Sequence, residues 1–310
     1  MTQTTTTPRE RFLAAAHGRA TDRPPVGAWV HFGTATASPQ LTAALHLNFL
    51  ESYGWDYLKT MHDFRLPVPI EGDLRQRLEG FATLGTEWDS YARQRAVLAE
   101  LRRSAPDVAI VETQFSPFQT TIRSLGEGVV EVFKADPGLA DQVIGRTAEL
   151  LARWVGDLAG LGVDAVFLAL TGASADASSY GITEEQYRRW VAPHDITVLR
   201  AAEGLVRIAH VHGDDVHTDW LAEHPYEVLS WAERSSGPSI QQVLDAGRVP
   251  LVGLDERSSL YLGTEQVHQL VASKRREAGD RIIVGPNCTM HTDTNPEVFH
   301  ALRSSVEVAL

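Results

Sequence analysis

Short apolar runs recur at fairly even intervals along almost the whole chain, and each is followed by a segment with helical character. The apolar runs are mostly continuous stretches of Val, Ile, Leu and Ala, a pattern typical of parallel strands that are buried on both faces. Eight runs are expected to form strands: residues 26–30, 57–61, 108–114, 165–170, 205–209, 226–231, 249–255 and 281–288.

Eight strand–helix units without a linker between halves predict an α/β fold, a single (β/α)8 TIM-barrel domain over residues 8–310. Its first helix is expected to begin at Pro8, with Thr7 as N-cap and Glu10 completing a capping box. Residues 65–89 are expected to form an irregular excursion over one face. An open doubly wound sheet is the alternative, but no Gly-x-Gly-x-x-Gly follows the first strand, which argues against a dinucleotide-binding version.

The composition narrows the class of protein. With 310 residues and 43% hydrophobic residues the chain can bury a full core, and a formal net charge of −12 argues against nucleic acid as a partner. There is no run of 18 apolar residues, so no membrane span is expected. A single cysteine excludes internal disulfides and favours a reducing cytoplasm. Residues 1–7 are polar, lack the layout of a signal peptide, and are expected to be a disordered tail.

Two of the predicted strands end on residues of the types that commonly bind metals. His210 and His212 stand two residues apart at the end of the fifth strand, so their side chains point to the same side, and Cys288 ends the eighth strand. Two imidazoles and a thiolate are good zinc ligands that leave a fourth position for a substrate or water. The same set also suits copper or iron. Alternatively, the histidines are ordinary ones and the cysteine is an inert buried side chain.

Further polar residues follow other predicted strands, and their gathering at one end of a barrel favours an enzyme. His31 follows the first predicted strand, and Glu112 and Asp255 belong to the ends of the third and seventh. His62 follows the second strand, and Tyr180 lies in the loop after the fourth. The two carboxylates are candidates for a base or for a partner of a metal ligand, and the other three for acid–base or binding roles. Alternatively, the histidines are satisfied buried residues, Glu112 pairs with an arginine such as Arg123, and Asp255 caps a loop.

Several short motifs occur in an order that resembles the uroporphyrinogen decarboxylase superfamily, and specifically its zinc-dependent branch, the corrinoid-protein:coenzyme M methyltransferases. The motifs are an Arg-x-Arg-Phe-Leu-Ala-Ala helix from Arg9, then Asp22-Arg23-Pro24-Pro25-Val26, Gly263-Thr264-Glu265-Gln266-Val267, Gly285-x-x-Cys288 and Asn295-Pro296-Glu297. The resemblance covers nearly the whole chain. It implies a TIM barrel, a small-molecule substrate, and a corrinoid carried on a separate protein.

The resemblance also implies the metal ligands. The branch holds zinc with a His-x-Cys pair and a later Cys, which correspond here to His210, His212 and Cys288. His212 stands where the branch usually has Cys. A neutral imidazole in place of an anionic thiolate makes the metal a stronger Lewis acid, which favours activation of water or of an oxygen ligand.

Three functions follow as hypotheses. The first is methyl transfer to or from a zinc-activated small substrate. The second is a zinc-dependent lyase, decarboxylase or hydrolase reaction on a small polar metabolite. The third is a non-catalytic, metal-binding barrel within a complex. Decarboxylation of uroporphyrinogen itself is disfavoured, because residues 28–33 lack the arginines of the Arg-Gln-Ala-Gly-Arg motif of those decarboxylases.

Overall fold

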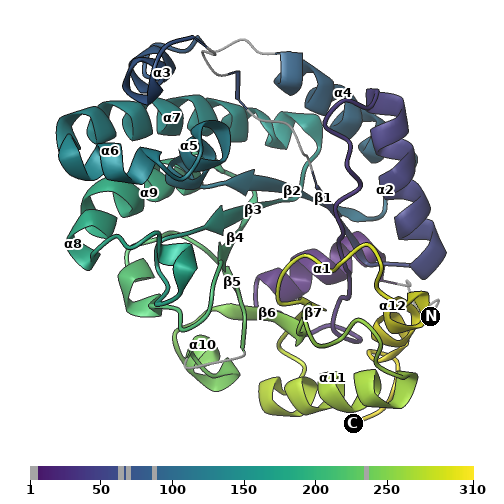
Figure 1. The fold of residues 1–310 in the computed structure, drawn as a ribbon. Coiled ribbons are helices and arrows are strands. Elements are labelled where there is room, and N and C mark those ends of the chain that lie inside the picture. The colour runs from purple at the N-terminus through teal and green to yellow at the C-terminus, as the bar shows by residue number, and fades with distance from the viewer. Residues whose placement is uncertain (1–5, 62–65, 68–70, 86–88, 234–236) are drawn as a thin grey trace.

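Seven parallel strands form one curled sheet in the order of the sequence, with helices around its outer face (Figure 1). The computed structural model describes residues 6–61, 66–67, 71–85, 89–233 and 237–310. The strands are β1 (Tyr57–Thr60), β2 (Ala109–Phe115), β3 (Ala165–Leu170), β4 (Val206–Val211), β5 (Val228–Trp231), β6 (Val249–Leu254) and β7 (Ile283–Pro286).

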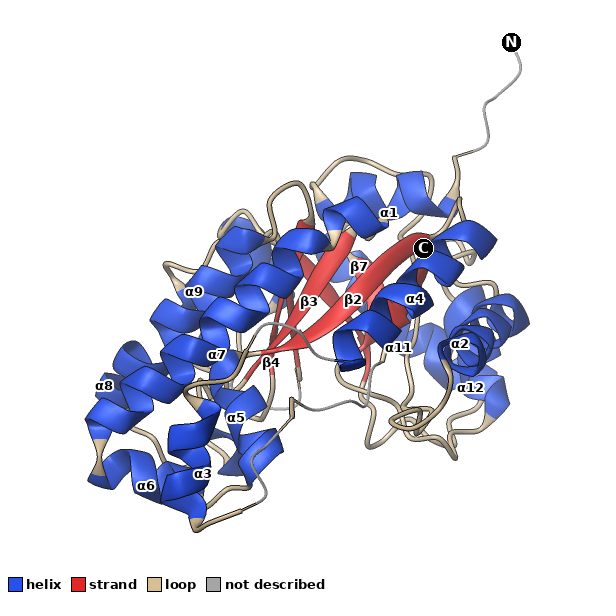
Figure 2. Ribbon diagram, turned by 90° about the horizontal axis from the view of Figure 1, so that it is seen from above, coloured by secondary structure: helices blue, strands red, loops and turns tan. Residues whose placement is uncertain are grey.

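Helices connect the strands and cover the sheet on its outer side (Figure 2). The α-helices are α1 (Pro8–Ala16), α2 (Pro39–Tyr53), α3 (Leu74–Phe81), α4 (Asp89–Ser104), α5 (Pro117–Leu125), α6 (Val129–Ala135), α7 (Pro137–Asp157), α8 (Glu184–Gln186), α9 (Ala192–Ala201), α10 (Ile240–Asp245), α11 (Thr264–Ala278) and α12 (Pro296–Ser304). Short 3₁₀ turns lie at η1 (Ala159–Leu161), η2 (Ala177–Ser179) and η4 (Thr218–Leu221), and η3 (Tyr187–Val191) is a π-helical turn between α8 and α9.

The first predicted strand does not form, and the prediction of eight regular strands is wrong in this respect. Residues 26–30 make only two isolated parallel bridges, from Val26 to Val284 and from Val30 to Met290. One physical reason is that the backbone N–H of Val26, which a ladder to a neighbouring strand would use, donates instead to the carboxylate of Asp56 at 2.9 Å. The described residues therefore form an α/β fold with a seven-stranded sheet rather than a closed eight-stranded ladder.

The stretch 65–89, predicted to be irregular, contains a helix. Asp73 caps α3 by accepting from the backbone N–H of Gln76, and the Gln76 side chain accepts from the backbone N–H of Asp73. This capping box is present in the sequence as Asp-x-x-Gln. At the amino end the predicted capping box of Thr7 and Glu10 is confirmed. Residues 1–5 of the predicted disordered tail lie outside the described residues.

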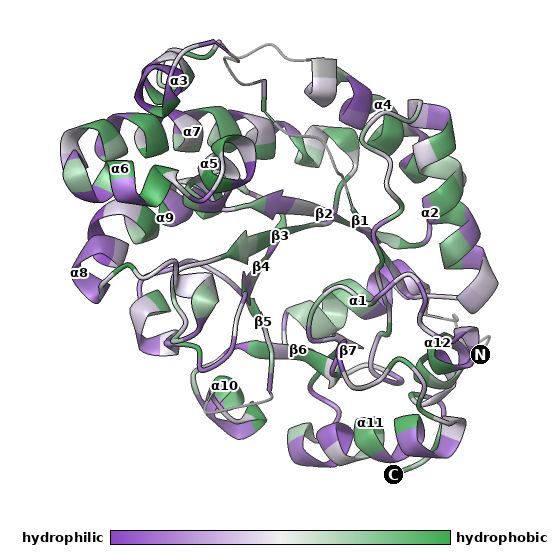
Figure 3. Cartoon of the chain, in the orientation of Figure 1, coloured by the Kyte–Doolittle hydropathy of each residue, from purple (hydrophilic) through white to green (hydrophobic). Residues whose placement is uncertain are grey.

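Both faces of the sheet are buried, as the continuous apolar runs predicted. Most strand residues are hydrophobic (Figure 3). The outer face packs against the helices. The inner face is filled by alternate residues of the strands, and the fully buried Phe12 of α1 packs against this inner core, 5.1 Å from the ring of Tyr57. In the part of the chain that the structure describes, no helix combines the length and apolarity needed to cross a membrane.

A buried ion cluster fixes the segment that runs beside β1. The carboxylate of Asp56, 1% exposed, accepts from Arg11 at 2.8 Å and from Arg23 at 2.6 Å. It also accepts from the backbone N–H of Val26 at 2.9 Å. The Arg-Phe-Leu and Asp-Arg-Pro-Pro motifs of the sequence thus have a structural role, because they position residues 26–30 between β7 and the start of β1.

Candidate metal centre

Three metal-binding side chains converge at the carboxyl ends of β4 and β7. His210 lies in β4 and His212 directly after it, and both continue the row of inward-facing residues that begins with Val206 and Ile208. Cys288 follows β7. The ligand atoms of the three residues all lie within 4.8 Å of one another.

Hydrogen bonds orient the two imidazoles differently. Nδ1 of His210 lies 3.1 Å from Oγ of Ser230 in β5, which leaves Nε2 to face the centre of the triad. Nδ1 of His212 lies 3.7 Å from Sγ of Cys288. A hydrogen bond on the far nitrogen is how proteins usually fix the tautomer and orientation of a metal-binding histidine. Ser230 was not anticipated from the sequence, although it is the one polar residue of an otherwise apolar strand.

The surroundings favour the protonation states that a metal requires. Burial lowers the pKa of His210, which is 4% exposed, so its neutral form predominates. Burial raises the pKa of the Cys288 thiol, but its hydrogen bond with His210 helps to bring that pKa below its ordinary value. Neutral imidazoles and a thiolate are the forms that bind zinc. The donor set and its spacing therefore fit a single Zn²⁺ ion.

The triad lines a cavity of about 260 Å³ at the carboxyl ends of the strands. Its walls combine aromatic rings, polar side chains and two cations, and the described lining contains no acidic residue: Trp29, His31, Lys59, Met61, Thr113, Phe115, Gln119, Arg123, Phe167, Ala169, His210, His212, Cys288 and Thr289. This position matches the end of a parallel barrel at which active sites are built.

Lys59 is a cavity residue that the sequence reasoning missed. It lies in β1 on the inner face, 4% exposed, and its ammonium lies 4.1 Å from the ring centre of Phe167. Burial lowers its pKa to about 7, although the nearby Cys288 and Glu112 raise it. The signal was present in the sequence, as a charged residue inside the apolar run 57–61.

The other predicted residues lie in different places. His31 lines the cavity, as expected for a residue that follows residues 26–30. His62 lies outside the described residues. Glu112 is fully buried on the outer face of the sheet, where it binds Thr60 and the amide of Gln94, 2.9 Å away. Strand parity explains this position, because Val111 and Thr113 point inward and Glu112 between them points outward.

Asp255 and Tyr180 are not among the residues that line the cavity. Asp255 follows β6 and accepts hydrogen bonds from the backbone N–H groups of Arg257 and Ser258, at 2.9 and 2.8 Å. Tyr180 ends the η2 turn with a positive φ of 52°, and its ring lies 6.2 Å from that of Phe118. Burial, followed by the charge of Glu127, raises its pKa.

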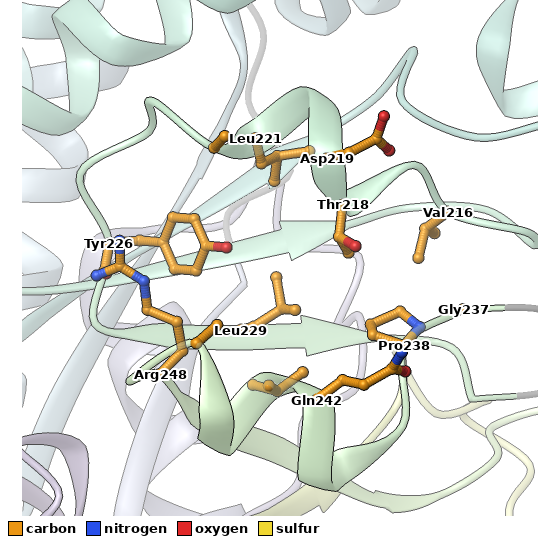
Figure 4. Close-up of a pocket in the computed structure, with 13 residues that line it drawn as sticks. Val216, Thr218, Asp219, Leu221, Tyr226, Leu229, Gly237, Pro238, Gln242 and Arg248 are labelled. Atoms are coloured by element: carbon orange, nitrogen blue, oxygen red, sulfur yellow. The ribbon is translucent and has the colours of Figure 1, made fainter.

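A second cavity, of about 500 Å³, lies on the outer side of the sheet between η4 and α10 (Figure 4). Its walls are formed by residues such as Leu229, Val243, Tyr226 and Arg248. The connection between β4 and β5 contains only the four residues of η4 as helix, so the sheet is thinly covered there. None of the predicted metal ligands or acid–base candidates lines this cavity, and it is set apart from the triad.

A family model described as uroporphyrinogen decarboxylase (URO-D) matches residues 95–308. The chain belongs to this family. The match includes β2 to β7 and all three residues of the metal-binding triad. No match was found among curated protein sequences.

Solved structures share the fold at low sequence identity. A methyltransferase from Methanosarcina mazei has a TM-score of 0.78 at 16% identity, over 98% of this chain and 99% of the other. A GH10 endoxylanase from a sugarcane soil metagenome has a TM-score of 0.52 at 11% identity, over 91% and 97% of the two chains. A β-mannanase from the blue mussel Mytilus edulis has a TM-score of 0.51 at 10% identity, over 91% of each chain. These likenesses extend over the whole fold.

Proposed function

We propose that this chain is a zinc-dependent enzyme of the methyltransferase-like branch of its family, which transfers a methyl group to or from a small substrate. The observation that carries the proposal is the convergence of His210, His212 and Cys288 on the wall of a cavity. The extent of the likeness to the archaeal methyltransferase supports the choice of branch. We also infer that residues 26–30 fill the gap between β7 and β1 and so complete a (β/α)8 barrel over residues 8–310. Their backbone makes hydrogen bonds to β7 and to Asp56, just before β1.

Each residue of the site has a distinct part in this proposal. His210 through Nε2, His212 through Nδ1 and Cys288 through Sγ would hold Zn²⁺, which when bound supplies Lewis-acid activation of a substrate thiol or oxygen. Ser230 keeps His210 in the ligating tautomer. His31 is placed in the cavity wall to bind the substrate or take up its proton.

The methyl step balances without an oxidant or reductant. A substrate thiol gives its proton to a base, and the sulfur forms a bond to the methyl carbon with its own electron pair. The bond between the methyl carbon and its donor breaks, and the donor keeps the bonding pair. A corrinoid on a separate protein is the proposed donor. We also propose a reducing compartment such as the cytoplasm, which a chain with the single thiol Cys288 favours.

The cavity favours a substrate far smaller than a tetrapyrrole. Sites for drug-sized ligands enclose roughly 300–1,000 Å³, and this cavity encloses about 260 Å³. A macrocycle of four pyrroles with eight carboxylates exceeds that space. The size of the cavity therefore supports a small metabolite rather than uroporphyrinogen as the substrate.

A lyase, decarboxylase or hydrolase reaction is the second candidate, and the composition of the triad favours it. Two neutral imidazoles and one thiolate leave a bound zinc ion more electron-poor than two thiolates and one imidazole would. Such a site is better suited to an oxygen ligand, including the carboxylate of a small polar metabolite. Turnover of such a substrate without methyl transfer would favour this candidate over the first.

Methyl transfer is tested most simply with free methylcobalamin as donor and a small thiol as acceptor. The zinc-loaded chain should demethylate methylcobalamin in the presence of the thiol. The change in the visible absorbance of methylcobalamin measures the rate. The variant Cys288→Ala should reduce the rate to that of the buffer control. Equal rates with and without protein, at one zinc ion per chain, would refute the methyl-transfer version and leave the second candidate.

A further inference from the structure

We propose that Lys59 is the specificity-determining residue of the cavity and binds a carboxylate of the substrate that occupies the cavity beside the metal-binding triad. This inference rests on the proposed function for the presence of a substrate beside the metal-binding triad. The anion site itself rests on the surroundings of Lys59.

Lys59 is held rigidly inside the cavity wall. Its Nζ donates to Oγ1 of Thr113 at 2.8 Å and to Sδ of Met61 at 3.0 Å. The ring centres of Phe167 and Trp29 lie 4.1 and 4.9 Å from the same nitrogen. An ammonium carries three donors, so one remains for a ligand. A side chain fixed on four sides loses little further freedom when a ligand binds.

No carboxylate of the described residues lies in direct contact with the ammonium of Lys59. A buried ammonium costs several kcal/mol unless an anion pairs with it, yet no acidic side chain of the described residues forms an ion pair with Lys59. Glu112 on the neighbouring strand points to the opposite face and binds Thr60 and Gln94 instead. A carboxylate of the substrate would supply the missing partner.

The distribution of charge in the whole molecule points the same way. The chain has 40 acidic residues and a net charge of −12. The described lining of the cavity nevertheless has no acidic residue and contains two cations, Lys59 and Arg123. An acidic protein that keeps carboxylates out of one cavity, and places a buried cation there, is built to receive an anion at that position.

The use of lysine at this position is itself informative. The sequence contains three lysines, at positions 59, 134 and 274, and uses arginine at its other basic positions. Lys134 and Lys274 pair with Glu131 and Glu233 at 2.9 Å each. Lys59 is thus the lysine with no acidic partner among the described residues.

Paired probes that differ in one charge test the proposal. The full chain as purified is titrated calorimetrically with 3-phenylpropionate and with the neutral 3-phenylpropionamide, and again after metal chelation, so that carboxylate binding to a metal is separated from binding to Lys59. The carboxylate should bind at least tenfold more tightly than the amide. Lys59→Met should reduce this preference to less than twofold, and the matched control Lys134→Met should keep it.

A measurement on the wild type alone keeps the test decisive if Lys59→Met does not fold. Reductive methylation followed by mass spectrometry reports the labelling rate of each of the three lysines. With 3-phenylpropionate present, labelling of Lys59 should slow at least fivefold while Lys134 and Lys274 are unchanged. No preference for the carboxylate, a preference retained in Lys59→Met, or equal labelling of Lys59 with either probe would each overturn the proposal. Because zinc content is measured separately, a protein without zinc would refute the proposed function and leave the anion site standing.

Discussion

The Sγ atom of Cys288 lies 3.7 Å from Nδ1 of His212, although 76 residues separate them in the chain. Two parallel strands, β4 and β7, bring the residues together, because each strand ends at the same edge of the curled sheet. His210 on the same face completes a set of donors that matches the needs of zinc. The fold thus builds the site from strand ends rather than from one contiguous motif.

Removing the hydroxyl that orients His210 should weaken zinc binding without abolishing it. In Ser230→Ala the imidazole loses the hydrogen bond at Nδ1, and losses of such partners typically cost 10- to 100-fold in metal affinity. Competition with a chromophoric chelator should show a zinc Kd at least tenfold higher, still at one ion per chain. Ser258→Ala, whose hydroxyl binds Asp255 at the surface, is the control and should bind zinc as the wild type does.

Much of this arrangement was predictable from the sequence, and strand parity explains what was not. The i, i+2 spacing of His210 and His212 predicts that they lie on one face, and the ligand atoms of both lie within 4.8 Å of the Cys288 sulfur. Glu112 was chosen because it ends a strand, yet the inward residues there are Val111 and Thr113, so it faces the helices instead. When both faces of a strand are buried, the sequence does not show which alternate residues point into the barrel and which point toward the helices.

The absence of a regular strand at residues 26–30, the first predicted strand, has a different cause. Apolar residues 26–30 look like a strand, but two prolines precede them and an ion cluster around Asp56 fixes their path. Neither the pairing of Arg11 and Arg23 with Asp56 nor its burial is visible in a local pattern, because the three residues lie far apart in the sequence. Contacts of this kind follow only from the packed structure.

The two carboxylates bound by Arg11 should differ sharply in their effect on stability. Asp56→Asn removes the buried anion that Arg11 and Arg23 share and should lower the free energy of unfolding by about 3 kcal/mol or more. Asp22→Asn removes a carboxylate with a half-exposed side chain and should cost under about 1 kcal/mol. Urea denaturation measures both, and equal losses would contradict the structural role assigned to Asp56.

Glu112 should make the stability of the protein depend on pH in a defined window. Burial raises its pKa from 4.5 to about 7, against the hydrogen bonds from Thr60 and Gln94. The folded state therefore holds its proton more tightly than the unfolded chain does, so stability is full below about pH 4.5 and falls as pH rises to about 7.

The variant Glu112→Gln removes that dependence while keeping the shape of the side chain. The free energy of unfolding of the variant minus that of the wild type should increase by about 2 to 3 kcal/mol between pH 5 and pH 8. Denaturant unfolding of both proteins at the two pH values measures this difference. A constant difference across the range would show that Glu112 does not titrate there.

The close contact of β6 and β7 should not tolerate a side chain. Gly253 is in register with Gly285, and a Cβ at Gly253 would lie 2.7 Å from the Gly285 carbonyl oxygen, a backbone atom that cannot move aside cheaply. Gly253→Ala should therefore cost about 2 kcal/mol of stability in urea denaturation. At Gly160 a Cβ meets nothing within 4 Å, so Gly160→Ala should leave stability almost unchanged.

The metal content of the protein is the most direct test of the claim that His210, His212 and Cys288 hold zinc. Inductively coupled plasma mass spectrometry of the purified chain should find about one zinc ion per chain, and His210→Ala, His212→Ala and Cys288→Ala should each lose it while remaining folded by circular dichroism. The variant His31→Ala, which changes the cavity wall outside the triad, should keep its zinc. A wild type without metal, or zinc retained when both His212 and Cys288 are replaced, would contradict the account.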